Sequence, residues 1–272
     1  MVVIAAIFHA TWNGLAKRTD DPLTRLAIST ATSTIISFFF LFHLPIPESS
    51  SWPFLLGSII THQLYYIGVS LGYKLGDLSQ VYPIQRGMAP LLIALGAYFF
   101  ASEALSILGT LGILTISLSI VGLTLIKRKE EANRHATICA LFTGTMIASY
   151  TIFDGLGGRL SGNIFSYIAW LFFLDGIPFS LTVFFINRRT IHHRIKKEIA
   201  GGLGIGILGG TAYAITIWAL TYAPMAYVSA LRETSVVIAV WIGCRILKEP
   251  FGSKRMIAAI FITFGVALLH MS

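Results

Sequence analysis

Two arginines stand inside apolar stretches at matching places in the sequence. Arg86 lies in VYPIQRGMAPLLIAL, which starts at Val81, and Arg232 lies in YVSALRETSVVIAVW, which starts at Tyr227. A charged side chain at the centre of a membrane helix costs about 2.5–3.5 kcal/mol on insertion scales, so such an arginine usually has a partner or a function. A guanidinium group can hold a carboxylate or phosphonate through two parallel hydrogen bonds. The pair therefore favours binding of a small molecule that carries an anionic group.

Other polar side chains in apolar stretches could take part in the same chemistry. Besides the two arginines, the candidate substrate-binding residues are His9, Trp12, Asn13, His62, Tyr66 and Tyr82. A carboxyl group in lipid gains and loses its proton closer to neutral pH than one in water. The candidate proton-coupling residues are therefore the buried acids Asp154, Asp175 and Glu233.

The two arginines differ in the acid expected beside them. Asp154 is at about the depth of Arg232, whereas Asn13 takes the equivalent place beside Arg86. We therefore expect a salt bridge between Arg232 and Asp154, which leaves Arg86 as the less compensated charge and the better anion site. Glu233 follows Arg232 directly and could pair with either arginine. Structural ion pairs, or side chains that reach toward the membrane surface, are the alternative interpretation of both arginines.

The composition indicates a membrane protein. Of 272 residues, 55% are hydrophobic and 12% are charged, and the mean hydropathy is +0.77. Soluble chains carry about 25% charged residues. The net charge of +8 resides in short connections between apolar stretches, so we expect a lipid bilayer around the chain and no nucleic-acid partner.

Ten apolar segments are about long enough to span a bilayer as helices. They are 1–17, 24–44, 53–73, 78–100, 105–126, 136–157, 164–186, 199–220, 226–246 and 254–271. The odd-numbered connections are rich in lysine and arginine, as in KRKEEANRH and NRRTIHHRIKKE, whereas the even-numbered ones hold only Arg159. Because positive residues stay in the cytoplasm, this bias predicts that both termini lie outside.

The two halves of the chain repeat each other. WNGLAKR, from Trp12, aligns with FDGLGGR, from Phe153, and Arg86 and Arg232 also align. The sequence thus predicts an all-α integral membrane protein with ten transmembrane helices, made of a repeat at 1–126, a linker at 127–135 and a repeat at 136–272. Because each repeat has five helices, the second must be inverted, and inverted repeats are typical of transporters with a binding site near the midplane.

The repeat pattern resembles a known family. Pro90 followed by FFASEAL, and ILKEPFGSKRMIAAIFITFGVALL in the second half, are similar to the repeat ends of EamA-type members of the drug/metabolite transporter superfamily. The HATWN, VYPIQRGMAP and ALRETS blocks further resemble a subgroup labelled phosphonate-utilisation-associated membrane proteins. Family members usually have cytoplasmic termini, so the charge bias predicts the opposite orientation for this chain.

Together these observations predict a secondary transporter in the bacterial cytoplasmic membrane, for a small organic anion or zwitterion. A proton or ion gradient, or exchange, would drive alternating access. The alternative is an intramembrane enzyme that acts on lipid-linked phosphates, but the sequence holds no HExxH or GxSxG motif and no GxxxxGK[ST] loop. We expect no catalytic residue, cofactor or metal site, and a monomer or homodimer.

Overall fold

The computed structural model describes most of the chain, namely residues 1–2, 4–8, 11, 21–75, 78–122, 133–235, 237–238 and 253–272. At residues 73, 78–80 and 253–256 it describes the backbone alone. Within these ranges the regular structure is entirely helical, as predicted.

Six helical stretches are long and apolar enough to cross a membrane. They are α2 (Pro22–Leu41), Ser49–Gly72 with most of α3 (Trp52–Leu75), Val81–Ala101 of α4 (Leu78–Ala101), α6 (Arg134–Arg159), α7 (Ile164–Asn187) and α8 (Ile191–Tyr222). Shorter apolar helices are α5 (Ile107–Gly122) and Ile257–His270 of α11 (Ser253–His270). These match eight of the ten predicted spans. Of the first span, 1–17, residues 4–8 are described and are helical.

Two predicted segments differ from the structure. The polar connection expected at 187–198 is largely helical, because α8 begins at Ile191 and has 32 residues. At about 1.5 Å per residue this helix exceeds the bilayer core by roughly three turns, so its charged first turns can extend into water. In the span expected at 226–246, α9 (Met225–Arg232) ends at a turn at Glu233; residues 234–235 and 237–238 are again helical, and residues 236 and 239–246 lie outside the described part of the chain.

The helices form two compact units, and each contains residues from both halves of the sequence. Unit 1 comprises residue 1, residues 3–63 and residues 153–221. Unit 2 comprises residue 2, residues 64–152 and residues 222–272. The predicted repeats, 1–126 and 136–272, divide the chain by sequence similarity, and that division stays a prediction.

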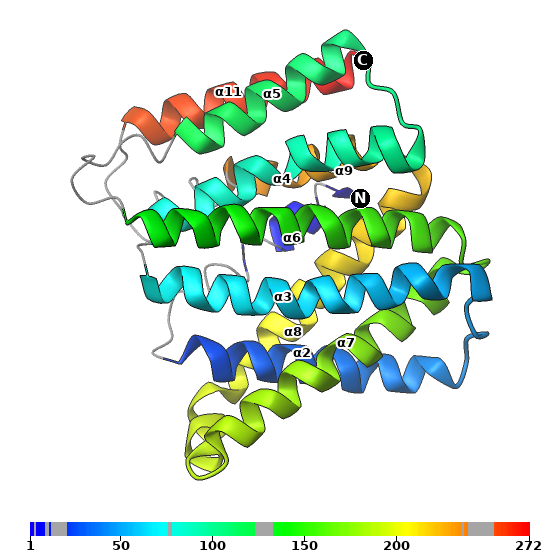
Figure 1. The fold of residues 1–272 in the computed structure, drawn as a ribbon, viewed down its shortest axis with the longest axis vertical. Coiled ribbons are helices and arrows are strands. Elements are labelled where there is room, and N and C mark those ends of the chain that lie inside the picture. The colour runs from blue at the N-terminus through cyan, green and yellow to red at the C-terminus, as the bar shows by residue number, and fades with distance from the viewer. Residues whose placement is uncertain are drawn as a thin grey trace. The chain divides into compact units, whose positions relative to one another are not determined.

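In unit 1, small residues bring α2 close to both α7 and α8, and α2 and α7 lie side by side in Figure 1. A Cβ added at Gly176 of α7 would lie 2.6 Å from the carbonyl oxygen of Thr30. One at Gly206 of α8 would lie 2.7 Å from the carbonyl oxygen of Ser29. Close packing of this kind is what drives helices together in lipid, where there is no hydrophobic effect between them.

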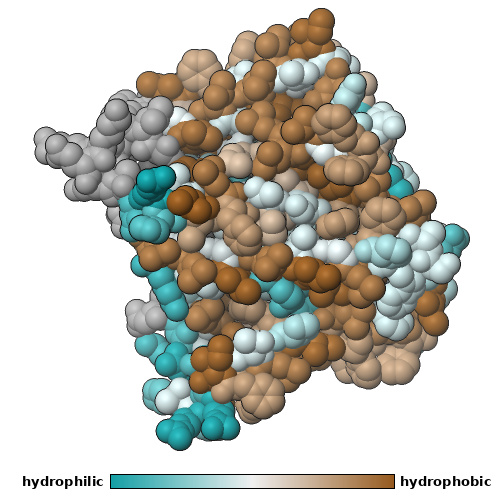
Figure 2. Space-filling model, viewed as in Figure 1, coloured by the Kyte–Doolittle hydropathy of each residue, from teal (hydrophilic) through white to brown (hydrophobic). Residues whose placement is uncertain are grey.

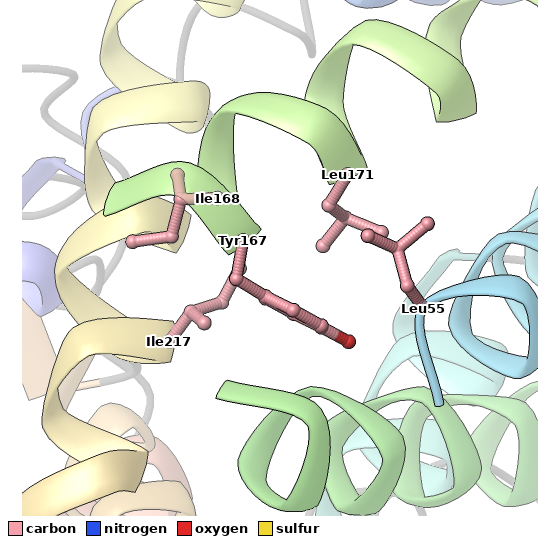
Figure 3. Packing of buried hydrophobic residues seen from close by; sticks show 5 residues of the cluster. All are labelled: Leu55, Tyr167, Ile168, Leu171 and Ile217. Atoms are coloured by element: carbon pink, nitrogen blue, oxygen red, sulfur yellow. The ribbon is translucent and has the colours of Figure 1, made fainter. Parts of the chain in front are cut away.

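The core of unit 1 lies where α3, α7 and α8 approach each other. Its buried side chains, shown in Figure 3, are Leu55, Tyr167, Ile168, Leu171 and Ile217. Elsewhere large apolar side chains face outward, and Figure 2 shows a mainly hydrophobic surface over the described helices. This is the pattern expected where lipid is the solvent.

In unit 2, α5 and α11 run side by side, as Figure 1 shows. Gly112 and Gly265 make this approach possible, since a Cβ on either would lie 2.8 Å from the carbonyl oxygen of the other. Gly87 similarly brings α4 against α5, where a Cβ would lie 3.0 Å from the carbonyl oxygen of Ser117. α4, the helix that carries Arg86, is therefore packed tightly against α5 at Gly87, the residue next to Arg86.

Two hydrogen bonds join connections between the predicted spans. In unit 1, the amide of Glu48 in the second connection donates to the carbonyl of Ser161 in the sixth, at 3.1 Å. In unit 2, Asn133 in the fifth connection donates to the carbonyl of Leu75 in the third, at 2.6 Å. Even connections thus meet even ones, and odd connections meet odd ones.

The start of α2 and the start of α8 are also joined, by an ion pair. Arg194 Nη1 lies 2.7 Å from Asp21 Oδ2, and the other carboxylate oxygen accepts from the amide of Thr24 to cap α2. Partial burial of Asp21 opposes ionisation, but the hydrogen bonds from Thr24 and Arg194 outweigh it and lower the pKa of this carboxyl. One turn deeper, Arg25 Nε donates to Glu198 at 2.6 Å.

Candidate functional site

Arg86 in α4 is paired with Glu233, the residue that follows α9. Its Nε donates to Glu233 Oε2 at 3.1 Å, and its Nη2 lies 2.7 Å from Oε1. Both residues are buried, with 5% and 1% of their surface exposed. The contact is a buried ion pair with one charge-assisted hydrogen bond, from Nε.

The backbone around this pair departs from regular helix. Pro90 has no N–H, so the carbonyl of Arg86 loses the hydrogen bond that a helix would supply from position 90. At the end of α9 the amide of Glu233 donates to the carbonyls of Ala230 and Leu231, which departs from the i+4 pattern of a regular helix. Interrupted helices at the ligand site are a recurring feature of transporters.

Arg232 and three tyrosines surround the ion pair. Arg232 is 8% exposed and is close enough to act electrostatically on Glu233. The hydroxyls of Tyr65, Tyr82 and Tyr150 are all within electrostatic range of Arg86. Among these described residues, which we call the arginine cluster, two guanidinium groups face one carboxylate.

This geometry corrects the expected difference between the two arginines. Arg86 is not the less compensated charge, because Glu233 lies 147 residues away in sequence yet directly against its guanidinium. The expected pair between Arg232 and Asp154 would join residues of different units and stays a prediction. Of the other candidates, Tyr82 belongs to the arginine cluster. Tyr66 follows Tyr65 of that cluster in the sequence, and the centroids of their rings are 5.4 Å apart.

Asp154 lies in unit 1, at the centre of a second group of polar side chains. It is completely buried. Tyr167 of α7 donates to Oδ1 at 3.2 Å, and Tyr213 of α8 donates a short hydrogen bond to Oδ2. His62 and Ser58, both on α3, also face Asp154. Three helices thus supply hydroxyl groups and an imidazole to one carboxyl group.

The orientation of His62 is set by its own helix. Its Nδ1 lies 2.9 Å from the carbonyl oxygen of Ser58 and 3.2 Å from the Ser58 hydroxyl. Because a carbonyl oxygen can only accept, Nδ1 carries a hydrogen, and Nε2 is the nitrogen that can gain or lose a proton. The imidazole also packs edge-on against Tyr213, with ring centroids 5.6 Å apart.

Asp175 of α7 has a more structural environment. Gln63 donates through one nitrogen to Asp175 Oδ1 at 2.8 Å and to the Asp175 carbonyl at 2.9 Å. Pro178 lies within the next turn and interrupts the hydrogen bonding of α7 there. The Gln63 contact ties α3 to α7 beside this interruption.

Some functional residues could not be identified from the sequence. Tyr167 and Tyr213 are 13 and 59 residues from Asp154, and nothing in their own segments marks them as its partners. In the sequence, Tyr65 and Tyr150 are marked only by lying close to predicted site residues, namely Tyr66 and Asp154. His9, Trp12 and Asn13 lie outside the described residues, so their predicted role in binding stays a prediction.

Comparisons with known proteins give the family. A model of the EamA-like transporter family matches residues 135–271, just over half of the chain. A solved crystal structure has a similar fold, with a TM-score of 0.77 at 14% identity, over 99% of this chain and 95% of its own. At that identity the similarity concerns the fold alone. No curated protein matches the chain.

Proposed function

Because the chain belongs to the EamA-like transporter family, and so is a multi-pass membrane transporter of the drug/metabolite superfamily, we propose that it moves a small organic anion or zwitterion by alternating access. The observation that carries this proposal is the arginine cluster. Two buried guanidinium groups and one carboxylate lie where the helices are interrupted. Ionisable residues buried in membrane spans are costly and usually mark a substrate or ion pathway.

The charges of the arginine cluster suggest how a substrate binds. A carboxylate or phosphonate would compete with Glu233 for the fork of Arg86, and the nearby guanidinium group of Arg232 would also attract it. The displaced Glu233 carboxylate would then be available to an ammonium group on the same molecule. Amino acids and aminophosphonates carry both groups, and a simple organic anion would use only the first contact.

Alternating access would follow from the repeated sequence. In our proposal the two five-helix repeats are inverted relative to each other, so that each forms the closed side of the protein in turn. The alignment of Arg86 with Arg232 places one cationic group in each repeat. We assign the protein to the bacterial cytoplasmic membrane, with transport driven by a proton or ion gradient or by exchange.

The proposed orientation has both termini outside. Cysteines introduced singly at 127–135 and 187–198 should then resist a membrane-impermeant thiol reagent in intact cells and react after permeabilisation. A cysteine introduced beside Arg159 in the even connection is the matched control and should react in intact cells. Ready labelling of the first two segments would reverse the orientation and leave the fold unaffected.

Substrate class is tested by ligand-induced thermal stabilisation of the purified chain. The panel contains amino acids, aminophosphonates, phosphonates and carboxylates, with uncharged amides of the same size as controls. An anionic or zwitterionic ligand should raise the melting temperature of the wild-type protein, and Arg86→Lys should weaken the effect because an ammonium cannot form the two-pronged contact. Arg194→Lys, a change at a half-exposed arginine away from the arginine cluster, should leave it intact. Stabilisation by the amides alone would refute the proposal.

A further inference from the structure

Unit 1 holds a completely buried carboxyl group whose contacts differ in kind from those in the arginine cluster. Asp154 receives hydrogen bonds from two phenols, one for each oxygen. The titratable groups that face it are His62 from α3, Tyr167 from α7 and Tyr213 from α8. Glu233, in contrast, is occupied by the guanidinium of Arg86, so protonating it would break an ion pair.

We propose that Asp154 and His62, with the hydroxyls of Tyr167 and Tyr213, form the proton-binding site of this transporter. The proton binds an oxygen of Asp154. When Asp154 is charged, the two phenols supply the hydrogen bonds that a carboxylate requires in a water-poor interior. When Asp154 is protonated on Oδ1, its new hydroxyl can donate to Tyr167, whose own hydrogen can turn to the carbonyl oxygen of Phe153, 3.4 Å away, while Oδ2 still accepts from Tyr213. The phenols can thus hydrogen-bond Asp154 in both protonation states.

The sequence also links this site to substrate binding. His62 lies three residues before Tyr65 on α3, and Tyr150 lies four residues before Asp154 on α6. The helices that carry the proton site therefore also carry two tyrosines of the arginine cluster. A shift of α3 or α6 on protonation would be felt by both groups. This coupling role rests on the proposed transport function, whereas proton binding at Asp154 does not.

Infrared difference spectroscopy of the full chain in lipid vesicles tests the proposal directly and needs no substrate. On acidification the wild-type protein should gain a carboxylic-acid band, sensitive to deuterium, that Asp154→Asn abolishes. Asp175→Asn is the matched control, a buried carboxyl group in the same unit, and it should leave the Asp154 band and its midpoint unchanged.

Two further variants keep the test decisive if Asp154→Asn folds poorly. His62→Gln removes a group that can carry positive charge, and Tyr213→Phe removes a hydrogen-bond donor to the carboxylate. Each should move the midpoint of the Asp154 band to higher pH by about one unit, since both stabilise the charged form.

Either of two results overturns the proton site: no band that depends on Asp154, or a midpoint that neither His62→Gln nor Tyr213→Phe moves. Such a result leaves the arginine cluster as a substrate site. Conversely, normal ligand binding by Arg86 variants refutes the arginine cluster as the substrate site and leaves the proton site intact.

Discussion

The arginine cluster and the Asp154 site show two ways in which a membrane protein keeps polar groups away from water. In the arginine cluster, opposite charges neutralise each other, and the pair of Arg86 and Glu233 is held by two short contacts. At Asp154 the carboxyl group meets uncharged hydroxyls and one imidazole, groups that accommodate either protonation state. The first arrangement is suited to exchanging one anionic partner for another. The second is suited to gaining and losing a proton.

The largest effect on stability should come from breaking the ion pair. Arg86→Ala strands a buried carboxylate at Glu233, and such losses typically cost about 3–5 kcal/mol. The free energy of unfolding in detergent should fall accordingly, and adding Glu233→Leu should restore most of it while substrate binding stays absent. Arg194→Ala removes a half-exposed partner of Asp21 and should cost no more than about 1 kcal/mol. An unchanged stability for Arg86→Ala would show that the pair is not a structural unit.

The Arg86 prediction reverses what the sequence implied. The sequence identified Arg86, Arg232, Asp154 and Glu233 as buried polar residues, because each interrupts an apolar stretch. It could not decide which acid belongs to which arginine. Pairing depends on the rotation of each helix about its axis and on the residue at which α9 ends. Successive residues in a helix point about 100° apart, so a shift of one residue changes which side chain faces a partner.

The spans were predictable for a simpler reason. Twenty apolar residues have few alternatives to a helix in lipid, since every backbone group must find its partner within the segment. The helical extension at the start of α8 was not predicted, because the segment from Ile191 is polar and the membrane does not limit its length. The partners of Asp154 on α7 and α8 were not predicted either, because contacts between distant segments depend on packing rather than on local pattern.

A substitution at the contact between α2 and α8 should have an intermediate effect on stability and should disturb the Asp154 site. Gly206→Ala would place a methyl group 2.7 Å from the carbonyl oxygen of Ser29 and push α8, which carries Tyr213, away from α2. We expect a loss of about 1–3 kcal/mol in the free energy of unfolding, together with a shifted midpoint of the Asp154 band. A Cβ at Gly122 has nothing within 4 Å, so Gly122→Ala should cause neither change. Equal effects of the two substitutions would contradict the proposed packing.

The smallest effect on stability should come from substituting Asp21. This substitution also tests whether mild acidification affects every acid in unit 1 or Asp154 in particular. The lowered pKa of Asp21 means that its contribution to stability is complete above the unfolded value, about 3.9, and disappears only as the pH falls through the lower folded value. Asp21→Asn should therefore cost about 1 kcal/mol or less. It should leave the pH dependence of stability between neutral and mildly acidic pH unchanged, whereas Asp154→Asn should alter it. Unfolding curves at several pH values measure both.

The division of roles between the Asp154 site and the arginine cluster is tested most directly by measuring exchange and pH-driven accumulation of one substrate in the same reconstituted vesicles. Once the ligand panel has supplied that substrate, each variant is assayed with and without an acid-outside gradient. Asp154→Asn should retain exchange and lose the accumulation that the gradient drives, whereas Arg86→Lys should weaken both in proportion. Normal gradient-driven accumulation by Asp154→Asn, or normal exchange by Arg86→Lys, would contradict the division of roles between the proton site and the arginine cluster.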